Sequence, residues 1–393
     1  MNSVMAIINN MPIKERSDKR FEGRITVNGN RKSFYGQTKT EVKNKAKEYL
    51  LKVENGYKEP QKITLNDYIE YWLKKYKWNK IEPSSYTRLY RVYECQIRNS
   101  IGNRMIGNIK TEDVQKIIDE YANPTNAKVK PLALSGLKRL IQLLRPCMQM
   151  AVKEGIIQAN PCNDVVLPVE SCIKTQTKEQ LTLNDDEILI FHDVALAKYK
   201  TTGEYKSRDA FILLIMLNLG LRVGEILALE WKDIKMQERL VDINKTVQSN
   251  IKNFDSTGNS TYNRVKNSTK TKSGRRILKL NDATIYYIQE LMAYDKRNNI
   301  TSKYIACTKV GTMNTSRNLQ RSLNRIVKDT GVPDGITLHT LRHTFGSSLV
   351  RHGVGIEVVS KLMGHANITI TYLKYIHVIQ EQEAKAMDMV TIC

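Results

Sequence analysis

The sequence has no long apolar run, no clustered cysteines and a shortage of acidic residues. No segment approaches the length of a bilayer-spanning helix, and no apolar secretory segment stands at the N-terminus, so we expect a cytoplasmic protein. The six cysteines are scattered without CxxC or Cys/His ligand spacing. This argues against structural zinc and fits reduced thiols in a cytosol.

Acidic residues number 40 against 62 lysines and arginines, so the formal net charge is +22. Self-repulsion of this size destabilises a compact chain unless a polyanion screens it, which makes solubility alone a poor explanation. Nucleic acid is the first candidate partner and an anionic membrane surface the second. With 393 residues, 41% of them hydrophobic, the chain can form two or three globular domains.

Residues 1–60 predict a small basic unit. Two β-prone stretches, 24–27 and 31–35, flank Asn28-Gly29, a strong hairpin turn signal, and a helix with one apolar face is expected from Thr40. A small sheet with one helix behind it can lay a strand face in a DNA groove. We interpret this unit as DNA-binding, the alternative being a solvated hairpin cap.

Residues 61–168 predict a helical bundle. Thr64 and Asp67 resemble a helix-capping pair, and apolar residues recur at helical spacing over 84–99, 111–121 and 132–154. The arginines and lysines on these helices either lie along a duplex or form an ordinary exposed face. The polar stretch 169–180 has no period and is interpreted as an interdomain linker.

Residues 181–393 predict a third unit of mixed α and β structure. The very apolar stretch from Ser207 ends at Gly220, a helix C-cap, which places Arg222 at a helix junction with Glu225 able to orient it. The segment 248–265 is polar without a core pattern and is expected to be a long mobile loop. A helix opened by acidic residues is expected near Leu183. Strands are expected at 241–243 and after a tight turn at 269–278, and helices at 282–295 and 317–330.

The segment from Thr337 to His377 holds five of the six histidines. Apolar residues between them recur at helical steps, so short helices would bring His339, Arg342, His365 and a tyrosine to one side of a small domain. Arginines can hold the non-bridging oxygens of a phosphodiester, histidines can donate to them, and a tyrosine can attack. This combination predicts phosphodiester chemistry that needs no metal and no cofactor.

Five short pieces occur in a distinctive order: Gly220-Leu221-Arg222-Val223-Gly224-Glu225, Thr269-Lys270-Thr271, His339-Thr340-Leu341-Arg342-His343-Thr344-Phe345, Leu362-Met363-Gly364-His365 and the region of Tyr375. In this order, over roughly residues 181–390, they resemble the tyrosine recombinase family, the integrases of phages and conjugative transposons. By organisation alone, residues 1–60 look like the arm-type DNA-binding domain of that family and residues 61–168 like its helical, SAM-like core-binding domain. The resemblance implies a multidomain, mainly α fold with small β-sheets and a mixed α/β catalytic domain at 181–393.

The resemblance also implies a role for each matching residue. Arg222 and Arg342 would clamp the scissile phosphate, and His339 and His365 would hydrogen-bond it. Lys270 would protonate the departing 5′ hydroxyl, and Tyr375 would attack and become a 3′-phosphotyrosine. The covalent intermediate stores the phosphodiester bond energy, so strand exchange would need no ATP.

Several assignments keep an alternative. Tyr375 is favoured as the nucleophile because Tyr375-Ile376-His377 matches the integrase pattern, while Tyr372 is read as packing. Lys272 competes with Lys270 as the acid, and Lys279 stands where many relatives carry proline, which leaves the hairpin register open. His343 is expected to point into the structure.

The leading hypothesis is a site-specific DNA recombinase that integrates and excises a mobile element in a bacterial cell, at the nucleoid. A Xer-like chromosome-dimer resolvase is the second hypothesis, and residues 1–60 favour an integrase over it. A type IB topoisomerase and a non-catalytic DNA-binding regulator are the further alternatives. The implied partners are double-stranded attachment-site DNA, a homotetramer formed through the helix after Tyr375, and an excisionase or a DNA-bending host protein; that helix could instead pack on its own domain.

Overall fold

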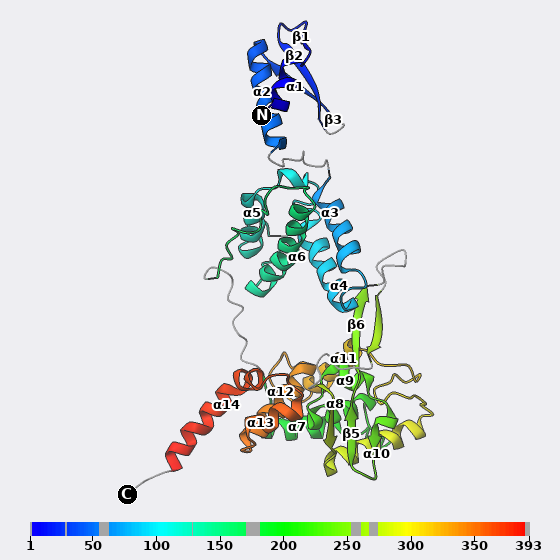
Figure 1. Ribbon diagram of the computed structural model, residues 1–393. Coiled ribbons are helices and arrows are strands. Elements are labelled where there is room, and N and C mark those ends of the chain that lie inside the picture. The colour runs from blue at the N-terminus through cyan, green and yellow to red at the C-terminus, as the bar shows by residue number, and fades with distance from the viewer. Residues whose placement is uncertain are drawn as a thin grey trace. The chain divides into compact units, whose positions relative to one another are not determined.

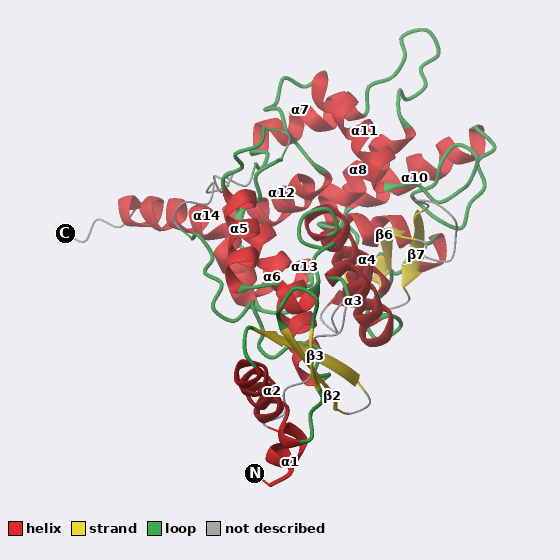
Figure 2. Ribbon diagram, turned by 90° about the horizontal axis from the view of Figure 1, so that it is seen from above, coloured by secondary structure: helices red, strands yellow, loops and turns green. Residues whose placement is uncertain are grey.

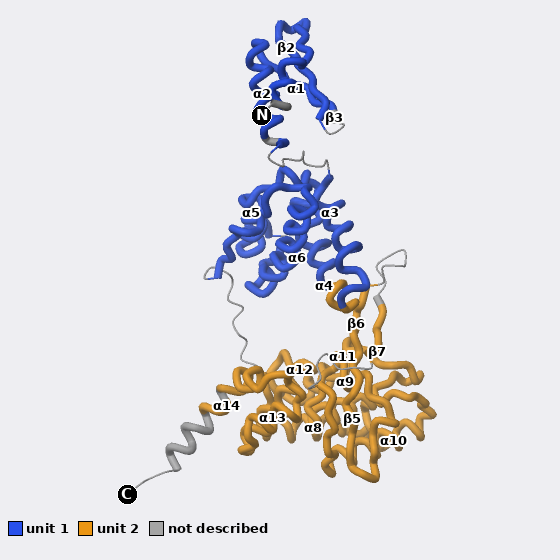
Figure 3. Tube along the Cα trace, in the orientation of Figure 1, with its two compact units in different colours: residues 1–81, 88–174 blue, residues 82–87, 175–393 orange. Residues whose placement is uncertain are grey.

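A computed structural model describes residues 2–27, 30–54, 63–127, 129–169, 181–252, 261–266 and 274–389. The chain divides into two compact units, Met1–Ile81 with Arg88–Lys174 and Glu82–Thr87 with Thr175–Cys393 (Figure 3). Helices predominate and the strands are short and antiparallel, as expected for the fold class (Figure 2). Among the described residues, no helix combines the length and apolar character needed to span a bilayer.

The N-terminal part of the first unit is a three-stranded sheet backed by helices. Its elements are α1 (Asn2–Asn9), β1 (Ile13–Glu15), β2 (Phe21–Val27), β3 (Asn30–Gly36) and α2 (Lys39–Glu54). Strands β2 and β3 pair up to Val27 opposite Asn30, which confirms the hairpin, while the turn residues Asn28 and Gly29 lie outside the described residues. Buried Val42, Ala46 and Leu50 of α2 cover the sheet, and α1 and β1 were not predicted from the sequence.

The rest of the first unit is helical, as predicted. Its α-helices are α3 (Leu65–Trp72), α5 (Thr111–Ala122), α6 (Leu134–Lys153) and the part of α4 (Pro83–Val92) that begins at Arg88. Thr64 and Asp67 form the expected capping box at the start of α3. The single helix expected over 84–99 ends its α-helical part at Val92 and continues as a π-helical turn, Tyr93–Ile97. Of the linker expected at 169–180, residues 170–180 lie outside the described residues.

Helix α8 forms the centre of the second unit. The helices of this unit are α7 (Asp185–Ala195), α8 (Arg208–Leu219), α9 (Val223–Ala228), α10 (Asp282–Arg297), α11 (Ser316–Lys328), α12 (Leu338–Arg351), α13 (Ile356–Met363) and α14 (Ile368–Met389) (Figure 1). Nearly every residue of α8 is buried, and α10, α11 and α12 pack against it. It ends at Gly220 in the left-handed conformation, with φ 59°. That stop sets the position of the residues that follow it.

The sheets of this unit correct one prediction. Strands β4 (Ile234–Lys235), β5 (Leu240–Ile243) and β8 (Arg276–Lys279) form an antiparallel sheet. The segment 248–265, expected to be a mobile loop, forms strands at both of its ends: they belong to β6 (Thr246–Lys252) and β7 (Thr261–Lys266), which pair with each other. Residues 253–260 of this segment lie outside the described residues. A register shift between Gln248 and Ile251, with Asn250 at φ 58°, interrupts the alternation of buried Val247 and Ile251. The three residues between them, Gln248, Ser249 and Asn250, are all polar, so the sequence shows no run of alternating apolar residues that would predict this strand.

Candidate active site

Four separate elements bring the predicted site residues of the second unit together. Arg222 is the N-cap residue of α9, directly after the turn that ends α8. His339 and Arg342 lie three residues apart on α12, which a Thr337 capping box starts. His365 follows Gly364, whose left-handed conformation ends α13, and Tyr375 lies on α14. The positions of Arg222, His339, Arg342 and His365 therefore depend on how a helix begins or ends.

Arg222 is held by a carboxylate and a carbonyl. Its Nη1 donates to Glu225 Oε1 at 2.7 Å, and its backbone N–H donates to Glu225 Oε2 at 2.9 Å. Its Nη2 donates to the Gly364 carbonyl at 2.8 Å. The sequence-based expectation that Glu225 orients Arg222 is confirmed. The Arg222 side chain is 38% exposed, so part of it still faces solvent.

Arg342 is held more deeply, by two carbonyls. Its Nη1 donates to Gly220 O at 2.6 Å and its Nη2 donates to Met363 O at 2.5 Å. Burial, followed by the charge of Arg222, lowers the pKa of Arg342 to about 9, so the guanidinium is still charged at neutral pH. A buried cation without a full counter-charge is costly, which makes this position attractive to an anion.

The two histidines of α12 differ in their surroundings. His339 is open to solvent on the same face as Arg342. Partial burial, then the charges of Arg342, Lys374 and Arg222, lower its pKa. His343 is buried, as expected, and its Nδ1 has no hydrogen-bond partner among the described residues. Burial also lowers the pKa of His343, to about 4, so its ring is neutral at pH 7, and the lowered pKa of His339 favours the neutral form there too.

His365 is half-buried and oriented by a residue that the sequence did not point out. Its Nδ1 lies 2.7 Å from Oγ1 of Thr371, a fully buried residue of α14. Burial, then the charges of Arg342, Lys374 and Arg222, lower the pKa of His365 to about 3. In a neutral ring, a Thr371 hydroxyl that donates to Nδ1 leaves the proton on Nε2, free to donate to a ligand. Thr371, Tyr375 and Val378 share one buried face of α14, and that spacing is the signal that could have identified Thr371.

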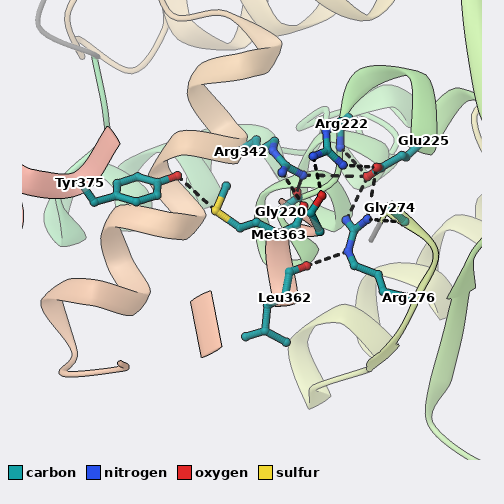
Figure 4. A network of polar contacts seen from close by, with 10 residues as sticks. Gly220, Arg222, Glu225, Gly274, Arg276, Arg342, Leu362, Met363 and Tyr375 are labelled. Carbon is teal, nitrogen blue, oxygen red and sulfur yellow. Dashed lines mark hydrogen bonds and ion pairs between the residues drawn. The ribbon is translucent and has the colours of Figure 1, made fainter. Parts of the chain in front are cut away.

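The two tyrosines of α14 have opposite environments. Tyr375 is fully buried, and its hydroxyl points to the Met363 sulfur at 3.2 Å (Figure 4). Burial raises the pKa of Tyr375 and the charge of Arg342 opposes that shift, so the phenol is protonated at neutral pH. Tyr372 is 44% exposed, so the interpretation of Tyr372 as a packing residue is wrong; Tyr375 is the packed one. The remaining predicted site residue, Lys270, and its alternative Lys272 lie outside the described residues.

Two further cations of the site were missed. Arg276 of β8 is buried and pairs with Glu225, its Nη2 lying 2.9 Å from Glu225 Oε2. Its place on the same strand face as buried Leu278, with exposed Ile277 between them, could have identified it. Lys374 is half-buried, and burial followed by the charges of Arg342 and Arg222 lowers its pKa. No spacing in the sequence points to Lys374.

The arrangement has an excess of positive charge. Arg222, Arg342 and Arg276 surround one buried carboxylate, that of Glu225, and the charge of Lys374 adds to those of Arg342 and Arg222. A neutral histidine donor and a phenol lie beside them. Guanidinium groups match a phosphate in charge and geometry, and preorganised donors stabilise a phosphoryl transition state. The chemistry that this site supports is therefore the binding and transfer of a phosphoryl group.

Known protein families match both halves of the chain. The phage integrase family matches residues 186–382, and the phage integrase N-terminal SAM-like domain matches residues 64–121. A protein named tyrosine recombinase XerC-like, from Caldanaerobacter subterraneus subsp. tengcongensis, is 29% identical over 372 residues, covering 91% of this chain and 90% of the relative. The integrase of Staphylococcus phage L54a is 23% identical, covering 73% of this chain and 80% of the relative.

Solved structures share the fold. The Tn1549 transposon integrase, in complex with transposon right end DNA, has a TM-score of 0.64 at 17% identity, covering 82% of this chain and 99% of that one. A lambda integrase tetramer bound to a Holliday junction has a TM-score of 0.58 at 16% identity, covering 94% of this chain and 95% of that one. At these identities the likeness concerns the fold alone.

Proposed function

Because the chain belongs to the phage integrase family of tyrosine recombinases, we propose that it is a site-specific DNA recombinase that cuts and rejoins DNA through a 3′-phosphotyrosine intermediate. The observation that carries the proposal is the convergence of Arg222 and Arg342, from α9 and α12, on consecutive carbonyls beside His365. These donors are set before any DNA is bound. Such preorganisation is what electrostatic catalysis of phosphoryl transfer requires.

In the proposed reaction, Arg222 and Arg342 bind the non-bridging oxygens of the scissile phosphate, and His339 and His365 donate to them. The Tyr375 oxygen attacks phosphorus and its proton passes to water, a phosphotyrosine bond forms, and the bond to the 5′ oxygen breaks. Lys270, with Lys272 as the alternative, gives a proton to that leaving oxygen. Exchange of one phosphoester for another conserves the bond energy, so the proposal includes independence of ATP, and the guanidiniums supply charge that a metal would otherwise provide.

The resting position of Tyr375 sets a condition on this reaction. Its hydroxyl contacts the Met363 sulfur and its ring is fully buried, whereas the arginines contact the carbonyls at the end of α13. Attack on a phosphate held by those arginines requires the phenol to leave the sulfur. We therefore expect DNA binding to shift α14, since the position of Tyr375 depends on that helix.

The proposal extends to the DNA and to the assembly. Residues 1–60, whose described part forms the sheet and α2, would bind arm-type sites, and the helical residues 61–168 would bind the core site. Lambda integrase is seen as a tetramer on a Holliday junction, and we propose a homotetramer on DNA for this chain, with an excisionase or a DNA-bending host protein setting direction. Integration and excision of a mobile element in the bacterial cytoplasm is the favoured role. Xer-like dimer resolution is the second candidate, because the match between this chain and a XerC-like protein covers 90% of that protein's length.

A nicked suicide duplex that carries a candidate attachment site tests this function. The wild-type protein is compared with Tyr375→Phe and, as a matched control on the same helix, Tyr372→Phe, with EDTA present and ATP absent. A covalent protein–DNA band that Tyr375→Phe alone abolishes is the expected result. Strong gel-shift binding with no covalent band in any of the three proteins would instead support a non-catalytic DNA-binding regulator.

A further inference from the structure

Three consecutive carbonyl groups at the end of α13 each accept a hydrogen bond from a different arginine. Leu362 O accepts from Arg276 Nε at 2.7 Å. Met363 O and Gly364 O accept from Arg342 and Arg222, the two proposed phosphate-binding residues. The last carbonyls of a helix have no partner within the helix and carry its negative dipole end, so they attract cations. The end of α13 is thus a common anchor for three guanidiniums.

Arg276 joins this anchor to the carboxylate that holds Arg222. Its Nη1 and Nη2 approach the two oxygens of Glu225 at 3.2 and 2.9 Å, and Nη1 also donates to Gly274 O at 3.2 Å. Glu225 in turn binds the Arg222 side chain and backbone. A planar guanidinium can make such paired bonds and a further bond through Nε in one fixed geometry, which an ammonium cannot. Arg276 therefore links the end of α13 to the start of α9 (Figure 4).

The hydrogen bonds of the arginines separate their roles. The side chains of Arg276 and Arg342 are 7% and 5% exposed, so burial does not distinguish them, but the hydrogen bonds of Arg342 come from Nη1 and Nη2 alone. The contacts of Arg276 with Glu225, Leu362 and Gly274 engage all three of its nitrogens. It is therefore placed to hold other groups and not to bind a phosphate itself.

Arg276 also compensates the charge of Glu225. Burial raises the pKa of the Glu225 carboxyl, but the hydrogen bond and charge of Arg276, followed by the charge of Arg222, outweigh burial and lower it. An uncompensated carboxylate beside the phosphate position would repel the substrate. With Arg276 in place, Glu225 can stay ionised and hold Arg222 without weakening the positive electrostatic potential that attracts a phosphate to the site.

We propose that Arg276 is a positioning residue for DNA cleavage, which holds Arg222 through Glu225 and holds the segment that leads to His365 through the Leu362 carbonyl. The inference rests on the proposed recombinase function and adds a residue to it that does not touch the substrate. Arg276 sets the distance between the end of α13 and the start of α9, and hence the distance between the donors that these elements carry.

The test measures single-turnover covalent complex formation on the suicide duplex by Arg276→Met. We expect a fall of about 10- to 100-fold in the cleavage rate, the range typical when a residue that orients a ligand-binding group is removed. DNA affinity in a gel shift should change far less, because Arg222 and Arg342 remain. The matched control is Arg208→Met, since buried Arg208 also pairs with a carboxylate, Asp295, and with two carbonyls.

Arg208 begins α8 and Gly220 ends it, so the control lies at the far end of that helix from the site. Both variants should lose stability in thermal unfolding, and Arg276→Met alone should lose cleavage. Equal losses of cleavage in both variants, or a wild-type rate in Arg276→Met, would overturn the proposal. A wild-type protein that forms no covalent complex would instead contradict the recombinase function itself, so the two failures are distinguishable.

A pH series supplies a readout that loss of stability would not produce. Without Arg276, burial raises the pKa of Glu225 while Arg222 and Arg342 still oppose that rise. The ratio of the Arg276→Met rate to the wild-type rate should therefore fall as the pH is lowered from about 8 to 6. Both proteins contain His339, His365 and Lys374, so the effects of their ionisation on the cleavage rate largely cancel in the ratio of the two rates.

Arg276→Lys completes the test and replaces Arg276→Met if that variant does not fold. A lysine keeps the charge beside Glu225 and loses the fork to Leu362 O. Its rate should be reduced by a factor that is constant with pH. A wild-type rate in Arg276→Lys would show that charge alone matters and would refute the positioning role.

Discussion

The hydrogen bond between Thr371 and His365 offers a sharp test of how the site is oriented. Thr371→Val removes the hydroxyl 2.7 Å from His365 Nδ1 and retains the shape of a fully buried side chain. The neutral imidazole, with its pKa lowered to about 3 by burial and then by Arg342, Lys374 and Arg222, can place its proton on either nitrogen. Without Thr371 the tautomer that donates from Nε2 is no longer selected.

The expected size of the effect follows from the strength of a neutral hydrogen bond. Such a bond contributes about 0.5–1.5 kcal/mol net, which converts to a fall of about 2- to 13-fold in the cleavage rate. Removal of the whole donor, as in His365→Ala, should cost about 100-fold or more, as for other aimed donors to a transition state. The Thr371 variant should therefore lie between the wild type and His365→Ala.

Single-turnover formation of the covalent complex measures this rate, with Thr371→Ser as the matched control. Serine keeps the hydroxyl and should cleave at close to the wild-type rate. Nitrogen NMR of the His365 ring should show the Nε2–H form in the wild type and in Thr371→Ser, and a mixture in Thr371→Val. Equal rates for Thr371→Val and wild type, or equal losses for the valine and serine variants, would refute the orienting role of the hydroxyl.

Two further predictions concern stability. Gly220→Ala forces a side chain into a left-handed position where Cβ would lie 2.2 Å from the Phe345 ring. Urea unfolding should therefore show that the free energy of unfolding falls by about 2–4 kcal/mol, from conformational strain and overpacking. In the control Gly203→Ala, with φ 67° and no atom within 4 Å of the new Cβ, it should fall by only about 1 kcal/mol. Burial lowers the pKa of His343 to about 4, whereas the unfolded chain takes up the proton near its ordinary value of about 6.5. The neutral form is thus favoured by folding, so the melting temperature should be highest above pH 6.5 and fall as the pH drops toward 4, less steeply in His343→Gln; an unchanged slope in that variant would contradict the assignment.

Local sequence patterns predicted most of the secondary structure because they act over a few residues. The capping pair at Thr64, the helix ending at Gly220 and the hairpin around Asn28-Gly29 were confirmed for their described parts. The loop expected at 248–265 was wrong at 248–252 and 261–265, which pair as parts of β6 and β7 with a bulge in β6, while residues 253–260 lie outside the described residues. A local pattern fails where a single residue shifts the register.

The sequence by itself determined the family, the order of the motifs and the residue types that the chemistry needs. Only the tertiary structure decided which groups meet. Arg222 reaches Gly364 across 142 residues and Arg342 reaches Gly220 across 122, and no periodicity records such contacts. The structure likewise decided that Tyr375 is buried and that Arg276 joins the site. The physical reason is that a side chain's burial, charge and hydrogen bonds depend on whichever distant segments pack around it.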